Sequence, residues 1–137
     1  MADLVITAAN VVPDDDAIVV DGALCGATIT AGDSVYVDEA DSNKIKLCDG
    51  NDAASSVCAG VALCGSSDGQ PISYCTIGRV IIGAAVAVGI AYYVTDNAGG
   101  IGTWAEVQVA SYATLVGIGV STTKIEIAPL VTGAVKA

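Results

Sequence analysis

The side chains that could do chemistry in this sequence are carboxylates and thiols, because the chain contains no histidine. Without an imidazole, neither a Ser-His-Asp nor a Cys-His nucleophilic site can be assembled. The run Asp14, Asp15 and Asp16, followed by Asp21, could bind Ca²⁺, since hard cations take clustered carboxylate oxygens. A calcium loop also needs alternating ligands and a bidentate acid at its end, and this sequence lacks both. We therefore predict a solvated acidic loop and no metal site.

Two further patterns resemble parts of enzyme sites but are incomplete. Asp38, Glu39 and Asp41 could share acid–base work, yet a loop without a pocket favours a solvated face. The glycine-rich run 65–69 lacks the lysine of a phosphate-binding loop, and 99–102 does not open a helix after a strand. The sequence thus predicts no catalytic residues, no cofactor and no enzymatic activity.

The five cysteines have none of the spacings of a zinc or redox site. No pair is separated by two residues, and no histidine could complete a metal site. Small buried hydrophobic side chains are the favoured interpretation, and one or two disulfides are the alternative. The cysteines concerned are Cys25, Cys48, Cys58, Cys64 and Cys75.

Composition limits the partners of the chain. Its 137 residues fit one domain, and only 15% are charged, where about a quarter is usual. So few charges suggest that partners cover much of the surface. The net charge of −10, with five scattered basic residues, argues against nucleic acid and against an anionic membrane surface. The uncharged run 80–94 is also shorter than the roughly 20 residues of a membrane span.

The pattern of short apolar runs predicts an all-β chain. Val, Ile, Ala and Leu dominate the apolar residues, turn signals separate the runs, and helical periodicity is weak. We expect an antiparallel β-sandwich or barrel, with short helices possible only near 52–57 or 104–112. The expected strands are 4–7, 18–20, 35–37, 45–47, 60–63, 71–77, 80–82, 91–94, 107–109, 115–118 and 124–127.

An internal repeat organises these strands. The GATITAG motif at Gly26 returns as GAAVAVG at Gly83, an offset of 57 residues. The same offset carries Tyr36 onto Tyr93. We interpret residues 17–137 as a single β domain made of two diverged copies, about 17–76 and 77–137. Residues 1–16 match neither copy and form an extended N-terminal arm.

Aromatic side chains at strand positions allow a second functional hypothesis. Tyr36, Tyr92, Tyr93 and Trp104 are typical of core or interface positions, but sugar-binding modules also use aromatic platforms. A groove lined by Tyr92, Tyr93 and Trp104 would favour an extracellular or tail-associated carbohydrate-binding β module. That module is the alternative to the function proposed from the resemblance that follows.

The order of several motifs resembles the small capsid decoration (cement) proteins of tailed bacteriophages. The motifs are ITAANVVP at 6–13, AGDSVY at 31–36, AGVA at 59–62, DGQP at 68–71, GIAYYVT at 89–95, GGI at 99–101 and VGIG at 116–119, followed by Ser121 and Thr122. The resemblance covers nearly the whole chain and carries no catalytic residues. It implies an all-β virion protein on the outer surface of the head that clamps neighbouring major capsid proteins.

The physical character of the chain agrees with that role. Interface cores are depleted in charge, and a negative net charge keeps particles apart. We expect a homo-oligomer, with a trimer favoured by the family analogy and by capsid three-fold positions. The arm is expected to contribute to capsid binding, because its apolar side chains have no cover within the repeat. The residues concerned are Leu4, Val5, Ile6, Val11 and Val12.

Overall fold

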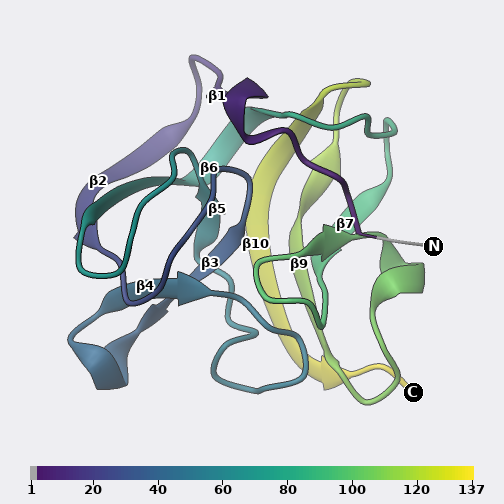
Figure 1. The fold of residues 1–137 in the computed structure, drawn as a ribbon. Coiled ribbons are helices and arrows are strands. Elements are labelled where there is room, and N and C mark those ends of the chain that lie inside the picture. The colour runs from purple at the N-terminus through teal and green to yellow at the C-terminus, as the bar shows by residue number, and fades with distance from the viewer. Residues whose placement is uncertain (1–2) are drawn as a thin grey trace.

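The computed structural model describes residues 3–137 and consists of strands joined by turns and three short 3-10 helices (Figure 1). The strands are β1 (Val11–Pro13), β2 (Ile18–Leu24), β3 (Ser34–Asp38), β4 (Lys44–Leu47), β5 (Gly60–Ala62), β6 (Pro71–Ile82), β7 (Ala91–Val94), β8 (Ile101–Gly102), β9 (Tyr112–Gly119) and β10 (Lys124–Val135). The 3-10 helices are η1 (Ala8–Asn10), η2 (Glu39–Asp41) and η3 (Trp104–Glu106).

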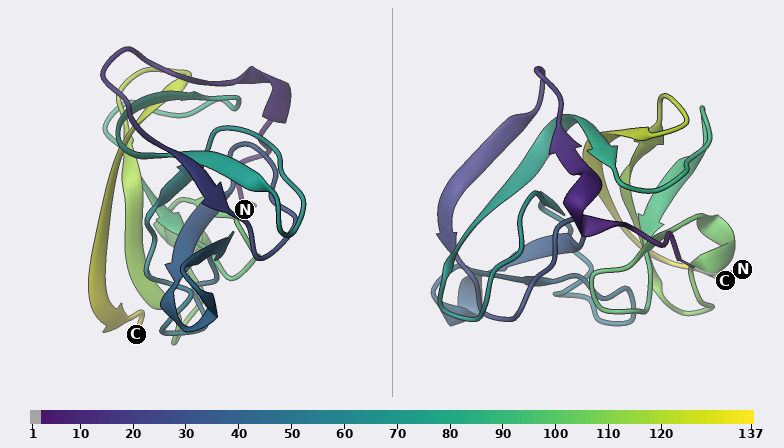
Figure 2. Two further views of the ribbon diagram at one scale, coloured as in Figure 1. Left: turned by 90° about the vertical axis from the view of Figure 1, so that its left-hand side faces the viewer. Right: turned by 45° about the horizontal axis from the view of Figure 1, so that its top comes forward.

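The strands form one antiparallel sheet that curls into a half-barrel (Figure 1). Its order is β4-β3-β5-β6-β10-β9-β7-β8, and β1 and β2 both pair with β6. The all-β antiparallel fold predicted from the sequence is therefore confirmed. In Figure 2, left, β9 and β10 lie on one side of the molecule, and η1 and β1 lie on the other.

The two halves of the sheet pair their strands in the same scheme. In the first half β3 pairs with β5 through Ser34 and Val61, and in the second β7 pairs with β9 through Ala91 and Ile118. Both members of the pair are displaced by the 57 residues of the sequence repeat. The origin of the halves as copies, and their boundary at 76/77, stay predictions.

The strand β6 belongs to both halves. Its first part pairs with β2 and β5, and its last part pairs with β1 and β10. Gly78 lies between these parts with φ +115°, a conformation that glycine adopts without a Cβ clash. A Cβ at Gly78 would lie 2.6 Å from the Cα of Ala17. The glycine therefore allows the two parts of β6 to pair with different strands.

Two predicted strands are wrong. Residues 4–7 form no strand, because their backbone is held by isolated bonds, such as Leu4 N–H to the Ile101 carbonyl and Thr7 N–H to the Gly83 carbonyl. Residues 107–109 follow η3 and are irregular, although Val107 is buried. Neither segment pairs with a neighbouring strand, and each leaves one valine exposed, Val5 and Val109.

The arm is part of the folded body. Val11 is buried and pairs with Ile82, while Leu4 and Ile6 pack against the larger core cluster. A Cβ added at Gly32 would lie 2.5 Å from Ile6, so the glycine leaves room for this side chain. The expectation that the arm's apolar residues lack cover is therefore wrong for these three. Val5 and Val12 stay exposed.

The core is divided between the two regions of the curled sheet. The larger cluster includes Val80, Ile125 and Ile127 from β6 and β10, all fully buried. The smaller cluster includes Val35 of β3, Ile45 of β4 and Ile72 of β6, all buried. Within residues 3–137, no helix has the length and apolarity needed to cross a bilayer.

Candidate binding surface

The carboxylates of Asp14 and Asp16 accept hydrogen bonds from other strands of the sheet. The Asp14 carboxylate accepts a bond from Lys124 Nζ at 2.7 Å, and this contact lowers the pKa of Asp14. Asp16 accepts the backbone N–H of Arg79, whereas Asp21 accepts the Ser73 hydroxyl on another part of β6. Residues 3–137 contain no group of three or more potential metal ligands.

The second acidic group encloses a lysine. Lys46 Nζ lies 2.8 Å from the Asp38 carboxylate and 2.9 Å from that of Asp41. The hydrogen bond that Lys46 donates to Asp38, then the one that it donates to Asp41, raises the pKa of Lys46, and Lys46 in turn lowers the pKa of Asp41. A depression lies beside Asp38 and Glu39, where the sequence predicted a loop without a pocket. Lys46 thus joins the carboxylates of Asp38 and Asp41 in one ion-pair cluster.

All five cysteines are free thiols, and all except Cys64 are buried. Burial, followed by the nearby Cys58, raises the pKa of the Cys48 thiol well above its usual range. Burial also raises the pKa of Cys75. These thiols therefore act as small core side chains, as the favoured interpretation predicted, and the disulfide alternative finds no bridge here.

The aromatic groove that would favour a carbohydrate-binding module does not form. Tyr92 is 3% exposed and its hydroxyl accepts the N–H of Ala87, so it belongs to the core. Tyr93 and Trp104 do meet, with ring centroids 5.2 Å apart. Lys136 Nζ lies 4.8 Å from the Trp104 ring centre and covers part of that ring. The three aromatic residues thus do not share one sugar-binding face.

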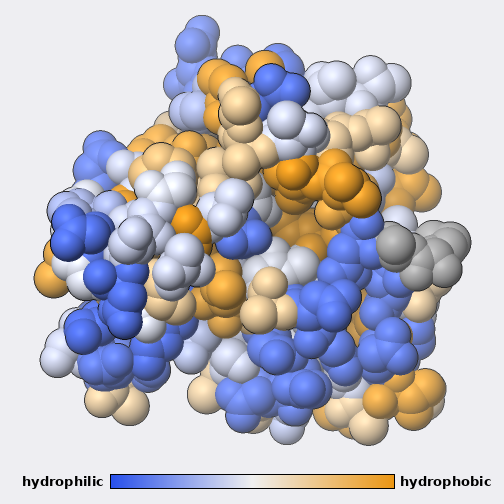
Figure 3. All heavy atoms as spheres, in the orientation of Figure 1, coloured by the Kyte–Doolittle hydropathy of each residue, from blue (hydrophilic) through white to orange (hydrophobic). Residues whose placement is uncertain are grey.

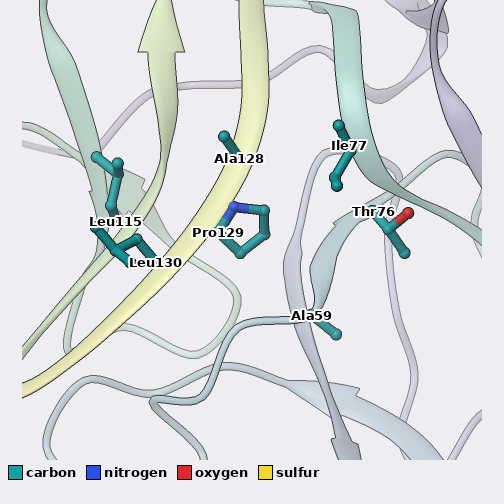
Figure 4. Close-up of a pocket in the computed structure, with 7 residues that line it drawn as sticks. All are labelled: Ala59, Thr76, Ile77, Leu115, Ala128, Pro129 and Leu130. Atoms are coloured by element: carbon teal, nitrogen blue, oxygen red, sulfur yellow. The ribbon is translucent and has the colours of Figure 1, made fainter.

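An apolar groove lies where β6 and β10 separate (Figure 4). Their ladder ends at the pair of Gly78 and Ile127, and beyond it β10 continues beside β9 alone. In Figure 4, Ile77 on β6 and Pro129 on β10 flank the resulting gap. The lining residues are Ala59, Thr76, Ile77, Leu115, Ala128, Pro129 and Leu130.

The groove continues into an apolar belt across the outer face of the sheet. Ile18 on β2 pairs with Ile77 on β6, and the two side chains are 58% and 56% exposed. On the other side of the groove Leu130 pairs with Leu115 of β9, and Leu130 is 59% exposed. Large apolar side chains exposed in contiguous patches mark interaction sites more often than scattered ones do.

The opposite face is different. Figure 3 shows this face in the orientation of Figure 1: hydrophilic residues gather over its lower part, and apolar residues over its upper part. The strands run β6, β10, β9 from left to right in Figure 1 and in the reverse order in Figure 4. The groove therefore opens on the face turned away from the viewer in Figures 1 and 3.

Sequence reasoning did not select the groove residues. The signal that could have found them is the run 127–135, which has no charged residue and follows the alternating strand 124–127. The sequence matches no protein-family model and no curated protein.

Proposed function

We propose that this chain is a structural virion protein that binds the outside of a phage head and stabilises contacts between major capsid proteins. The observation that carries the proposal is the exposed apolar belt around Ile18, Ile77, Leu115 and Leu130. A decoration protein must present apolar surface for assembly while its body remains rigid. The resemblance of the motif order to capsid decoration proteins supplies the identity of the partner.

The charge distribution supports the same function. The chain carries a net charge of −10, and several acids occur in the loop before β2 and around η2. Acidic surfaces of this kind repel neighbouring particles and nucleic acid. The residues of the apolar belt are themselves uncharged. Binding at many lattice positions would add avidity to individually modest contacts. We propose that the chain acts in this way as a homo-oligomer and without enzymatic activity, and the family resemblance favours a trimer.

Two exposed arm residues are the remaining candidates for direct contact with the capsid. Val5 is 87% exposed and Val12 is 48% exposed, although the rest of the arm is held on the body. Both could lose water at a capsid surface without unfolding the chain. We therefore limit the proposed capsid contacts of the arm to the side chains of Val5 and Val12.

Head binding tests the proposal directly. Purified chain is added to heads of its phage that lack it, and the heads are imaged by electron cryomicroscopy and stressed by heat. Saturable, lattice-ordered density together with greater heat resistance is the expected result. The double variant V5E/V12E should bind less, whereas V88E, which alters an exposed turn residue, should bind normally. Absence of wild-type density on the heads would refute the function.

A further inference from the structure

Two of the buried thiols meet at the ends of one loop. Cys48 follows β4 and Cys58 precedes β5, so residues 49–57 connect them. Both side chains belong to the larger core cluster, with exposed fractions of 0% and 5%. The Cys58 side chain lies within hydrogen-bonding reach of the Cys48 thiol. Two thiols in contact are the arrangement from which a disulfide can form.

The strand β3 holds both ends of this loop. Cys48 donates its backbone N–H to the Ser34 carbonyl at 3.0 Å, on the β4 side of β3. Ala59, the residue after Cys58, donates its N–H to the Val35 carbonyl at 2.8 Å, on the β5 side. The two cysteines are therefore fixed against neighbouring residues of one strand, and their side chains reach the same core cluster.

The loop between the two cysteines is closed on itself by its own hydrogen bonds. Asp49 N–H donates to the Ser55 carbonyl at 3.1 Å, and the Ser55 hydroxyl donates to the Asp49 carbonyl at 3.2 Å. Ser56 N–H donates to the Asp52 carbonyl at 3.0 Å. These bonds bring the two ends of the loop together without help from the thiols. A covalent bond between the thiols would therefore join the ends of a loop that is already closed.

One of the two thiols is closer to solvent than the other. Val57, the residue before Cys58, is 48% exposed and lines the depression beside η2. Cys48 has no exposed surface, and burial raises the pKa of its thiol. Because the thiolate is the reactive form of cysteine, Cys48 is the poorer first nucleophile. We expect a small reagent from solvent to react first at Cys58.

We propose that Cys48 and Cys58 form a disulfide when the protein meets a small organic disulfide such as oxidised glutathione. Cys58 gives its proton to water, and its sulfur attacks the reagent, so that one reagent thiolate leaves and a mixed disulfide remains. Cys48 then gives up its proton, and its sulfur attacks the Cys58 sulfur, which releases the second reagent thiolate. The two thiolates take up the two protons. The two protein sulfurs are thereby oxidised, and the two reagent sulfurs are reduced.

Only the timing of this step rests on the proposed function. A virion protein is made in the reducing interior of a cell and acts in an oxidising medium outside it, where disulfides persist. The bond would then form after release of the particle and close residues 48–58 into a covalent loop. Bond formation in a chain that fails to bind heads would leave the disulfide and remove the capsid function. Head binding by a chain whose thiols stay reduced under oxidant would do the reverse.

Peptide mass spectrometry after treatment of the native full chain with oxidised glutathione tests the pairing. Wild type at mildly alkaline pH should yield peptides joined through Cys48 and Cys58, and C64S, which removes the thiol that is not buried, should form the same bond. In C48S the mixed disulfide should persist at Cys58, whereas C58S should leave Cys48 unmodified. Circular dichroism confirms that each variant is folded. No bond in the native wild type, or a bond that joins any other pair, would overturn the inference.

The stability of the oxidised protein tests whether the loop geometry suits this bond. A disulfide stabilises a protein by restricting its unfolded chain, unless the bond strains the native structure. Oxidised C64S should therefore melt at least about 5 °C above its reduced form, and the gain should vanish when a reductant is added. C48S treated in the same way is the control and should show no gain. An oxidised C64S that melts no higher than its reduced form would overturn the inference.

Discussion

The substitution Gly60→Ala tests the close approach of neighbouring strands on which the curled sheet depends. A Cβ at Gly60 would lie 1.9 Å from the carbonyl oxygen of Cys75 on the facing strand. The second half contains the same arrangement, since a Cβ at Gly117 would lie 2.2 Å from the Glu126 carbonyl oxygen. Both obstacles are backbone atoms, so no side-chain rotation can relieve them.

The expected loss follows from the shift that the backbone must make. Ordinary contact needs a separation near 3.4 Å, so β5 and β6 would have to move apart by more than 1 Å at Gly60. Overpacking in a tight interior costs about 1–3 kcal/mol, and distortion of the β5–β6 ladder adds to it. We expect G60A and G117A each to lower the free energy of unfolding by about 3 kcal/mol.

Urea denaturation followed by circular dichroism measures this loss. Gly65→Ala is the matched control, because its Cβ would meet only the Ile29 carbonyl oxygen at an ordinary 3.6 Å. That substitution should change the stability by no more than about 0.5 kcal/mol, since alanine also loses less entropy on folding. G60A and G65A variants of equal stability would refute the strand approach described for β5 and β6.

Three further predictions concern the arm, the thiols and a half-buried acid. I6A should lower the unfolding free energy by about 2 kcal/mol, whereas V5A should change it by less than about 0.5 kcal/mol in the same urea assay, because only Ile6 packs on the core. Iodoacetamide at mildly alkaline pH should modify Cys64 in the native protein and Cys48 only after unfolding, as peptide mass spectrometry would report. Burial raises the pKa of Asp33, so the wild type should lose stability relative to D33N as the pH rises from the unfolded pKa through the folded one; a parallel pH dependence would contradict this.

The strands with alternating residues could be predicted from the sequence because their pattern is local. Residues 124–127 alternate charged and apolar side chains, and the structure buries Ile125 and Ile127 while leaving Glu126 exposed. Residues 31 and 32 likewise form a turn between two runs that the sequence predicts as strands, 18–20 and 35–37. Such features depend on neighbours in the chain, which the sequence displays directly.

The arm could not be predicted in the same way because its cover comes from distant residues. Ile6 packs over Gly32, and Thr7 bonds to Gly83, so the contacts join segments that the sequence keeps far apart. The composition of residues 4–7 suits a strand, but no strand edge is available beside them. Local propensity therefore gave the wrong element and an incorrect view of which apolar residues were uncovered.

The binding groove depends on the way the two halves share β6. The sequence repeat predicts a boundary between the two copies near 76/77. The structure has one continuous strand there, β6, and the strands that pair with it change near Gly78. The first part of β6 pairs with β2 and β5, so it cannot also pair with β10 beyond Ile127. The free edge of 128–135 is thus a consequence of joining two similar sheets through a single strand.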